Sequence, residues 1–238
     1  MNEWRDSEGP VLAVFAHPDD AEISSGGTLA KWAAQGRHVH LLVLTNGDRG
    51  SEEPDCDREE LARTRADEQA RASMVMGLTS FRILPNHDGE LENTADVRRE
   101  IVLTIREVQP QVVVTADPTT WFIGNRFMNH PDHRTAGATT MDAMFPAAGN
   151  PTYFPEQLEN GLTPWKVPVI RFAWTTEPNI FEDITGYLDT KLAALREHHS
   201  QIKKGQLQFF EQWMPLDADE AGRLVGVQHA EQYRQLQR

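Results

Sequence analysis

The sequence predicts an α/β protein whose mainly parallel central sheet is covered by helices on both faces, which makes three layers. Short, nearly continuous apolar runs, typical of strands buried on both faces, occupy residues 11–16, 39–45, 81–84, 112–115 and 169–174. Segments with helical periodicity separate most of these runs. Strands that alternate with helices are joined by right-handed crossovers, and we therefore expect parallel strands.

The helical segments complete the expected order of elements. Helices are expected at residues 28–35, 59–76, 97–108, 184–199, 206–213 and 219–235. Gly36 and Gly77 follow the first two, where a glycine commonly ends a helix. Residues 145–165 are rich in proline, glycine and aromatics and are expected to form an ordered loop. No repeat or linker interrupts the pattern, so residues 1–238 are expected to form a single domain.

Composition excludes several classes of partner. The 238 residues include 23 Lys and Arg against 36 Asp and Glu, and the net charge of −13 repels nucleic acid. Cys56 is the only cysteine, so an intramolecular disulfide is excluded and a cytoplasmic location is expected. The first ten residues are polar, and no run approaches the roughly 20 apolar residues that span a bilayer. No membrane partner is expected.

Two His-Pro-Asp segments carry the chemistry. One spans residues 17–20 directly after the first expected strand, and the other spans residues 130–133 beyond the fourth. Ligands of such sheets gather at the carboxyl ends of the strands, so both segments are expected to face the same rim. A catalytic zinc takes three nitrogen or oxygen ligands and keeps one position for water. Two histidines and a carboxylate meet that need, and the spacing favours His17, Asp20 and His133.

The neighbouring polar residues are expected to act on the reacting groups. Asp19 projects away from the ligands and is free to take a proton from a water molecule that the ion acidifies. His130 is placed to stabilise an oxyanion or to protonate a leaving amine. Asp132 is expected to orient a histidine from behind the ligands. Asp19, His130 and Asp132 are therefore the candidate catalytic residues.

Matches along the chain extend beyond these two segments. Ala-His-Pro-Asp-Asp with a nearby Glu occupies residues 16–22, and His-Pro-Asp-His occupies residues 130–133. Shorter matches occur at residues 45–48, 65–68, 88–89, 117–118, 148–155 and 198–201. In this order they resemble the zinc-dependent N-acetylglucosaminyl deacetylases known as the PIG-L or LmbE-like family, over residues 11–201.

The resemblance implies a Rossmann-like deacetylase fold, with zinc at the three ligands chosen from spacing and Asp19 as base. It also implies that the substrate is a small N-acylated amino sugar or related glycoconjugate. Positions matching Asp48 and Arg65 would contact the sugar, and the family pattern also covers His198. Some relatives carry a tyrosine two residues before the second motif as an oxyanion partner. Met128 stands there, so this role falls to another residue such as Tyr153 or is vacant.

Simpler interpretations of the three substrate-binding candidates stay open. Asp48 could cap a turn after Gly47, and Arg65 could pair with Glu68 along a helix. A histidine near the end of a helix, as His198 is, interacts favourably with the helix dipole. The identity of the metal is open as well. Two histidines and a carboxylate also bind ferrous iron, so Fe²⁺ or another divalent metal stands beside zinc.

Other functions also fit the pattern. The same ion could cleave a larger amide, in a thiol conjugate or glycoconjugate. Phosphoester cleavage usually needs two metals about 3.5–4 Å apart, and ligands are counted for only one. A protein that binds metal and ligand without turnover is a different class. A dinucleotide-binding oxidoreductase is disfavoured because no Gly-x-Gly-x-x-Gly follows the first strand. The sequence leaves the state of homo-oligomerisation open.

Overall fold

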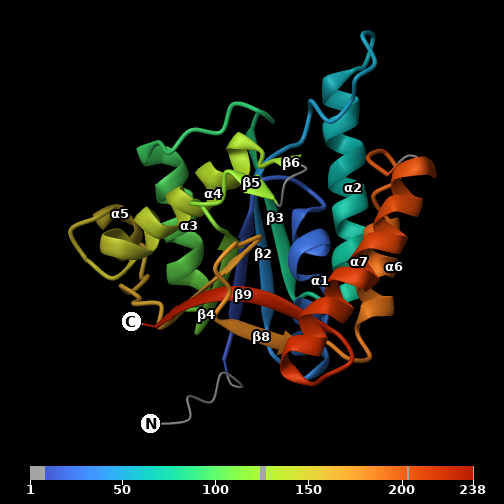
Figure 1. Cartoon of the computed structure of the whole chain (residues 1–238). Coiled ribbons are helices and arrows are strands. Elements are labelled where there is room, and N and C mark those ends of the chain that lie inside the picture. The colour runs from blue at the N-terminus through green and yellow to red at the C-terminus, as the bar shows by residue number, and fades with distance from the viewer. Residues whose placement is uncertain (1–8, 124–126, 203, 238) are drawn as a thin grey trace.

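The computed structural model describes residues 9–123, 127–202 and 204–237. Its main sheet has seven strands in the order β3-β2-β1-β4-β7-β9-β8 (Figure 1). These strands are β1 (Val11–Phe15), β2 (Val39–Thr45), β3 (Ser80–Asn86), β4 (Val112–Ala116), β7 (Val169–Ala173), β8 (Ile180–Asp183) and β9 (Ala230–Gln237). A separate hairpin pairs β5 (Phe122–Ile123) with β6 (Phe127–Met128).

The predicted mainly parallel sheet is confirmed. The strands β3, β2, β1, β4 and β7 are parallel neighbours, and β9 runs antiparallel to both β7 and β8. The order reverses beside β1, because β2 lies on one side of it and β4 on the other. In sheets of this kind the carboxyl ends of the strands flank a crevice at the reversal point. The turn after β1 lies at that point.

Helices cover both faces and complete the three predicted layers (Figure 1). The helical elements are α1 (Asp20–Ala34), α2 (Arg58–Met76), α3 (Ala95–Val108), α4 (Pro131–Asp142), the π-helical turn η1 (Ala143–Ala148), α5 (Pro155–Glu159), α6 (Leu188–Arg196) and α7 (Lys204–Val225). Alternate residues of β1 serve the two faces, as the pleat requires. Leu12 and Val14 pack in the core cluster formed with α3, α4 and η1, and Val11 and Ala13 pack in the cluster formed with α1.

The C-terminal segment corrects the sequence prediction. A helix was expected over residues 219–235, but α7 ends at Val225 and residues 230–237 form β9. The predicted helix over 206–213 instead belongs to the longer α7, which continues through Pro215. The polar composition of β9 hid the strand. Its backbone pairs on both sides, and Tyr233 is 0% exposed in the cluster packed on α1, so tertiary contacts override local propensity.

Residues 145–165 also contain more regular structure than expected. The π-helical turn η1 and the short helix α5 lie within or overlap this segment. The helix α4 was not predicted, although its N-terminus follows a recognisable rule. Pro131 occupies the first turn, and the His130 side chain accepts a hydrogen bond from the backbone N–H of Asp132. His130 therefore has a structural role, because its side chain caps α4.

Close packing fixes where α4 lies on the sheet. A Cβ atom added at Gly137 would overlap the backbone carbonyl oxygen of Ala116 at the end of β4, and it would also press on Pro118. Only glycine lets the two backbones come this close. The contact sets the position of the first turn of α4, which carries the second His-Pro-Asp segment, over the carboxyl edge of the sheet.

None of the described helices is long and apolar enough to pass through a bilayer. Residues 1–8, which belong to the polar N-terminal stretch considered in the sequence, lie outside the part of the chain that the structure describes.

Arg106 ties α3 to the segment after α4. Its side chain is 1% exposed, yet every hydrogen bond it donates goes to an uncharged oxygen. The acceptors are the Oε1 of Gln157 and the carbonyl oxygens of Ala147, Ala148, Asn150, Tyr153 and Phe154. The carbonyls of Ala147, Ala148, Asn150 and Phe154 each accept a backbone N–H as well, so Arg106 adds a second hydrogen bond to each and joins them to the Tyr153 carbonyl and to Gln157. Arg106 therefore stabilises the path of residues 147–157.

Arg106→Met is expected to lower the free energy of unfolding by about 3 kcal/mol, since it keeps apolar bulk but removes every hydrogen bond that the guanidinium donates to this segment. Urea unfolding followed by circular dichroism measures the change. Arg63→Met is the control, because the Arg63 side chain is 68% exposed, and it should change stability by less than about 0.5 kcal/mol. Equal effects of the two substitutions would contradict the role given to Arg106.

Candidate functional site

The two His-Pro-Asp segments meet at the carboxyl edge of the sheet. His17 follows β1, Asp20 is the first residue of α1, and His133 lies in the first turn of α4. His17 Nδ1 lies 3.3 Å from His133 Nε2 and 3.4 Å from Asp20 Oδ2, and His133 Nε2 lies 3.1 Å from Asp20 Oδ1. Donors arranged tetrahedrally around a zinc ion, each about 2.0–2.2 Å from it, lie about 3.3–3.6 Å apart. The three residues therefore have the spacing of a metal-binding face.

Two other groups of donors lie within reach of a cation. His17, His130 and His133 offer ligand atoms within 4.8 Å of one another, and so do His17, Asp88, His130 and Asp132. His130 Nδ1 already accepts the backbone N–H of Asp132 at 3.2 Å, which turns that nitrogen away from shared coordination. The shorter separations within the His17, Asp20 and His133 group favour it as the ligand set. A divalent cation fits these residues because one carboxylate and two imidazoles converge there.

Carboxylates behind His17 hold its other ring nitrogen. His17 Nε2 lies 3.0 Å from Asp88 Oδ1 and 3.3 Å from Asp132 Oδ2. Burial of His17 opposes protonation, but Asp20 and these two carboxylates outweigh it and raise the pKa of His17 well above the ordinary value. Asp132, 1% exposed, also accepts the backbone N–H of Gly89 at 2.7 Å. It therefore connects the loop after β3 to a candidate ligand.

His133 is held by residues that sequence analysis did not single out. The Oδ1 of Asn129 pairs with His133 Nδ1 at 2.9 Å, which leaves Nε2 toward His17 and Asp20. The ring of Trp174 stacks on the imidazole with centroids 4.6 Å apart and planes 24° apart. Trp174 follows β7 at the same carboxyl edge. The rule that ligands gather at the carboxyl ends of parallel strands, which located His17, would therefore also have located Trp174. The side chain of His133 thus has one orientation.

Asp19 has an unusual backbone. Its φ of 105° lies in the left-handed region, which costs a non-glycine residue on the order of 1–3 kcal/mol and is found mainly at functional sites. Its side chain is 15% exposed, and its Oδ2 lies 3.4 Å from Arg65 Nη2. Burial raises the pKa of the Asp19 carboxyl, and the Arg65 charge opposes this shift. Asp19 is next to the candidate ligand Asp20 but does not belong to the three converging residues.

A buried network holds the Asp19 backbone in place. The N–H of Asp19 donates to Gln69 Oε1 at 3.3 Å, and Gln69 Nε2 donates to Glu22 Oε1 at 2.7 Å. His198 Nε2 lies 3.6 Å from Glu22 Oε2, and both side chains are 0% exposed. Although burial opposes it, Glu22 raises the pKa of His198. Gln69 had no sequence signal, since it follows Glu68 in an ordinary helix.

The predicted sugar contacts of Asp48, Arg65 and His198 stay a prediction. Asp48 is 3% exposed, accepts the Asp88 N–H at 3.0 Å and pairs with His87 and Arg58. Arg65 is also 3% exposed and donates to the carbonyl oxygens of Pro18 at 2.6 Å and Gly47 at 3.0 Å. Each of the three side chains is buried against protein partners, so a sugar reaches them only by displacing those contacts. In the structure they brace the loops of the site.

His130 stands on the open side of the cluster. It is half-buried, and its ring centroid lies 4.7 Å from that of His17. Burial and the neighbouring imidazoles of His17 and His133 lower the pKa of His130. Because Nδ1 accepts the helix-capping hydrogen bond, Nε2 is the nitrogen that carries the proton of the neutral ring.

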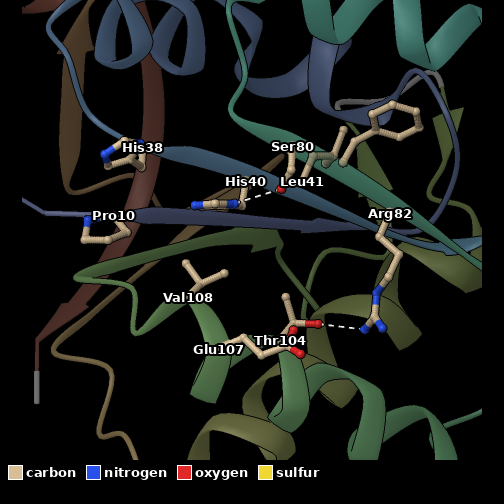
Figure 2. A pocket seen from close by; sticks show the side chains of 10 residues that line it. Pro10, His38, His40, Leu41, Ser80, Arg82, Thr104, Glu107 and Val108 are labelled. Atoms are coloured by element: carbon tan, nitrogen blue, oxygen red, sulfur yellow. Dashed lines mark hydrogen bonds between the residues drawn. The ribbon is translucent and has the colours of Figure 1, made fainter. Parts of the chain in front are cut away.

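A pocket of about 520 Å³ lies at the opposite edge of the sheet and is a separate feature. Figure 2 shows it between the amino ends of β2 and β3 and the C-terminal part of α3. Four of its polar side chains already interact in pairs: His40 Nδ1 lies 2.8 Å from Ser80 Oγ, and Arg82 donates to Thr104 Oγ1 at 2.7 Å. It holds none of the clustered donors described above, so we assign the chemistry to the carboxyl edge.

Comparison with solved structures identifies the class of this fold. The N,N'-diacetylchitobiose deacetylase of Pyrococcus horikoshii, solved with an inhibitor, aligns with a TM-score of 0.88 and 29% identity. The alignment covers 96% of this chain and 84% of that one. The protein therefore has the LmbE-like deacetylase fold that the sequence predicted.

The family model described as PIG-L, GlcNAc-PI de-N-acetylase, matches residues 12–144, which include both His-Pro-Asp segments. The diacetylchitobiose deacetylase of Thermococcus kodakarensis is 34% identical over 234 residues, 98% of this chain and 85% of that protein. A 1D-myo-inositol 2-acetamido-2-deoxy-alpha-D-glucopyranoside deacetylase of Saccharopolyspora erythraea is 31% identical over 84% of this chain and 86% of that protein. The chain belongs to the PIG-L family.

The ligand set predicts which single substitutions remove a bound cation. In protein loaded with one equivalent of zinc and then desalted, His133→Ala and Asp20→Ala are expected to lose most of the metal, because each removes one of three donors. His130→Ala is expected to keep about one ion per chain. Elemental analysis of the desalted proteins measures the stoichiometry.

His38→Ala, a substitution of an exposed histidine at the opposite edge of the sheet, is the control and should also retain one ion. Loss of metal from His130→Ala together with retention in Asp20→Ala would instead support the set of three histidines.

Proposed function

We propose that the protein hydrolyses the amide of an N-acetylated amino sugar or related small glycoconjugate, releasing acetate and the free amine. The observation that carries this proposal is the convergence of donor atoms from three residues, His17, Asp20 and His133, 3.1–3.4 Å apart, next to the partly buried carboxyl of Asp19. Membership of the PIG-L family supports it, as do relatives that are named deacetylases of acetamido sugars. The proposed enzyme is thus a metal-dependent amidohydrolase.

The proposed metal is zinc, bound by His17, Asp20 and His133. Two nitrogens and one oxygen form a donor set that zinc accepts with a further position free, and Fe²⁺ accepts it also. When bound there, the ion supplies Lewis acidity toward the amide carbonyl and lowers the pKa of water. Contacts from Asn129 to His133 and from Asp88 and Asp132 to His17 would keep both imidazoles aimed at it.

Asp19 is proposed as the general base. Its carboxyl takes a proton from the attacking water, whose oxygen then forms the bond to the amide carbon. The amide C–N bond breaks once the nitrogen has gained a proton, which the protonated Asp19 carboxyl returns, and the N–H of neutral His130 Nε2 is placed to donate a hydrogen bond to the oxyanion. One water is consumed, and acetate and the amine leave. The position matching the oxyanion tyrosine of some relatives is Met128, whose side chain is 85% exposed.

A second function shares the fold and the ligands: a protein that binds metal and sugar without turnover. The Asp19 carboxyl, which is next to Asp20 in the sequence but is not one of the candidate metal donors, favours catalysis over this alternative, because turnover needs a base and binding does not. Hydrolysis of a larger amide substrate, such as a thiol conjugate, would be the same type of reaction. The candidate donor groups among the described residues all include His17 and so overlap at one place, which gives no support to two-metal phosphoester cleavage.

Asp19→Asn is expected to lower the rate of acetate release from N,N'-diacetylchitobiose about 10³-fold, because the amide cannot take the proton of water. Its zinc content should stay at one per chain. Asp96→Asn, at a side chain 87% exposed on α3, is the control and should keep the full rate. A variant at Asp19 that keeps both its metal and more than half its rate would contradict the proposed base.

Gln69→Leu is expected to lower kcat about tenfold and leave KM within twofold, since it frees the Asp19 backbone without touching the ligands. Steady-state acetate release measures both constants. Gln208→Leu, at an exposed position of α7, is the matched control. A fall in thermal stability with kcat unchanged would show that Gln69 only packs the core.

A further inference from the structure

Behind Asp19 lies a buried ion pair that the proposed mechanism does not use. Glu22 of α1 and His198, which follows α6, are both 0% exposed, and His198 Nε2 lies 3.6 Å from Glu22 Oε2. Within the described part of the chain, neither of these two atoms has a hydrogen-bond partner. An ion pair at this depth adds little to stability, because both charges lose their hydration. A role in fixing a local conformation explains the pair better than a role in stability.

The position of His198 is fixed by α2. The backbone N–H and the Oγ of Ser200 donate to the two carboxylate oxygens of Glu68, each at 2.7 Å, and Glu68 is 2% exposed. The His198 carbonyl accepts the N–H groups of Gln201 at 3.1 Å and Ile202 at 3.0 Å, which closes the turn. The helices α1, α2 and α6 contact one another (Figure 1). The backbone that carries the imidazole is therefore fixed relative to α2.

The amide of Gln69 connects the ion pair to Asp19. Gln69 directly follows Glu68 in α2 and is 0% exposed. Its Nε2 donates to Glu22 Oε1 at 2.7 Å, and its Oε1 accepts the Asp19 N–H at 3.3 Å. A carboxylate only accepts hydrogen bonds, whereas a backbone N–H only donates them. An amide turned end for end would face a donor with its NH2 group and an acceptor with its oxygen, so a single orientation satisfies both neighbours.

His198 compensates the second oxygen of the Glu22 carboxylate. A carboxylate with a single hydrogen bond at this depth would be very unfavourable. Burial opposes protonation of His198, but Glu22 outweighs burial and raises the pKa of the imidazole. With His198 at one oxygen and Gln69 Nε2 at the other, the carboxylate is held at both ends. Its orientation then determines which end of the Gln69 amide is turned toward α1.

We propose that the Glu22–His198 pair positions Asp19 from behind, because it fixes the amide that holds the Asp19 N–H. The Asp19 backbone has a φ of 105°, so a fixed acceptor at its N–H also fixes the direction of its carboxyl. The inference rests on the proposed function, since it takes Asp19 as the base. Glu22 and His198 act through Gln69 and are positioning residues. His198 is thereby assigned to the support of the base and not to a sugar contact.

Steady-state acetate release from N,N'-diacetylchitobiose by zinc-loaded protein tests the inference. His198→Leu is expected to lower kcat about tenfold and to leave KM within about twofold, with the zinc content unchanged. His198→Gln keeps an N–H donor toward Glu22, and its kcat should lie within about threefold of the wild-type value. His199→Leu, at the exposed neighbouring histidine, is the matched control and should keep the wild-type kcat.

A double variant separates positioning from stability. His198→Leu leaves the Glu22 carboxylate buried without its partner, whereas Glu22→Leu combined with His198→Leu leaves no unpaired charge in the pair. The double variant is therefore expected to unfold at a higher urea concentration than His198→Leu. Its kcat should nevertheless stay about tenfold below wild type, because the Gln69 amide has lost the acceptor that orients it. A kcat that recovers together with stability would overturn the inference.

Hydrogen exchange at the Asp19 amide gives a readout that does not depend on activity. In isotope-labelled, zinc-loaded protein followed by NMR, this N–H is expected to exchange about fivefold faster in His198→Leu than in wild type and at an unchanged rate in His199→Leu. Unchanged exchange in His198→Leu would overturn the inference, as would a raised KM with unchanged kcat, which would make His198 a sugar contact. If wild-type protein releases no acetate, the proposed function fails, but faster exchange in His198→Leu would still support the link between the pair and Asp19.

Discussion

The site depends on buried carboxylates that are each paired with a histidine nitrogen. Asp20, Asp88 and Asp132 lie at most 8% exposed around His17, and a carboxylate without a partner at such depth would be very unfavourable. Separations of 3.0–3.4 Å from the nitrogens of His17 give each carboxylate a partner. This arrangement can accept a cation because negative charge is already concentrated there. The surrounding loops are held by the same carboxylates, so fold and chemistry share one set of interactions.

Three loops at the carboxyl edge are joined through these shared groups. Asp132 links the loop after β3 to His17, Asn129 links the β5–β6 hairpin to His133, and Gln69 links α2 to the turn after β1. Each of these side chains makes contacts in two directions. Rigid support of this kind reduces the reorganisation that a reaction would require. Because each link is one side chain, a shift in the position of one loop is passed to the donors through a single residue.

Much of this edge was predictable from the sequence because its signals are local. Apolar runs fixed the parallel strands, and the placement of polar residues at their carboxyl ends led to His17, Asp20 and His133. The supporting residues were harder to predict. Gln69 lies 47 positions from Glu22, and only the packing of α2 on the turn after β1 brings them together. Asn129 directly precedes the second motif. An asparagine there could equally be part of a turn, so its residue type does not predict that it binds a histidine.

The prediction for the C-terminal strand was wrong for a related reason. Its residues are polar, and the strand forms because β7 and β8 each provide a partner backbone, which no local pattern reveals. Asp48, Arg65 and His198 illustrate a different limit. A family motif locates a residue at the site, but only the structure describes its surroundings, and in this protein all three are enclosed by neighbours.

Gly137 has a consequence for how natural variants of this protein would be interpreted. It contributes no donor, carries no charge and lies in the middle of a helix, so a survey of sequence changes would rank an alanine there as harmless. Because the added methyl group would meet the Ala116 carbonyl, the helix must back away, and both His130 and His133 move with it. The defect would appear as displaced imidazoles at the carboxyl edge, although its origin is steric.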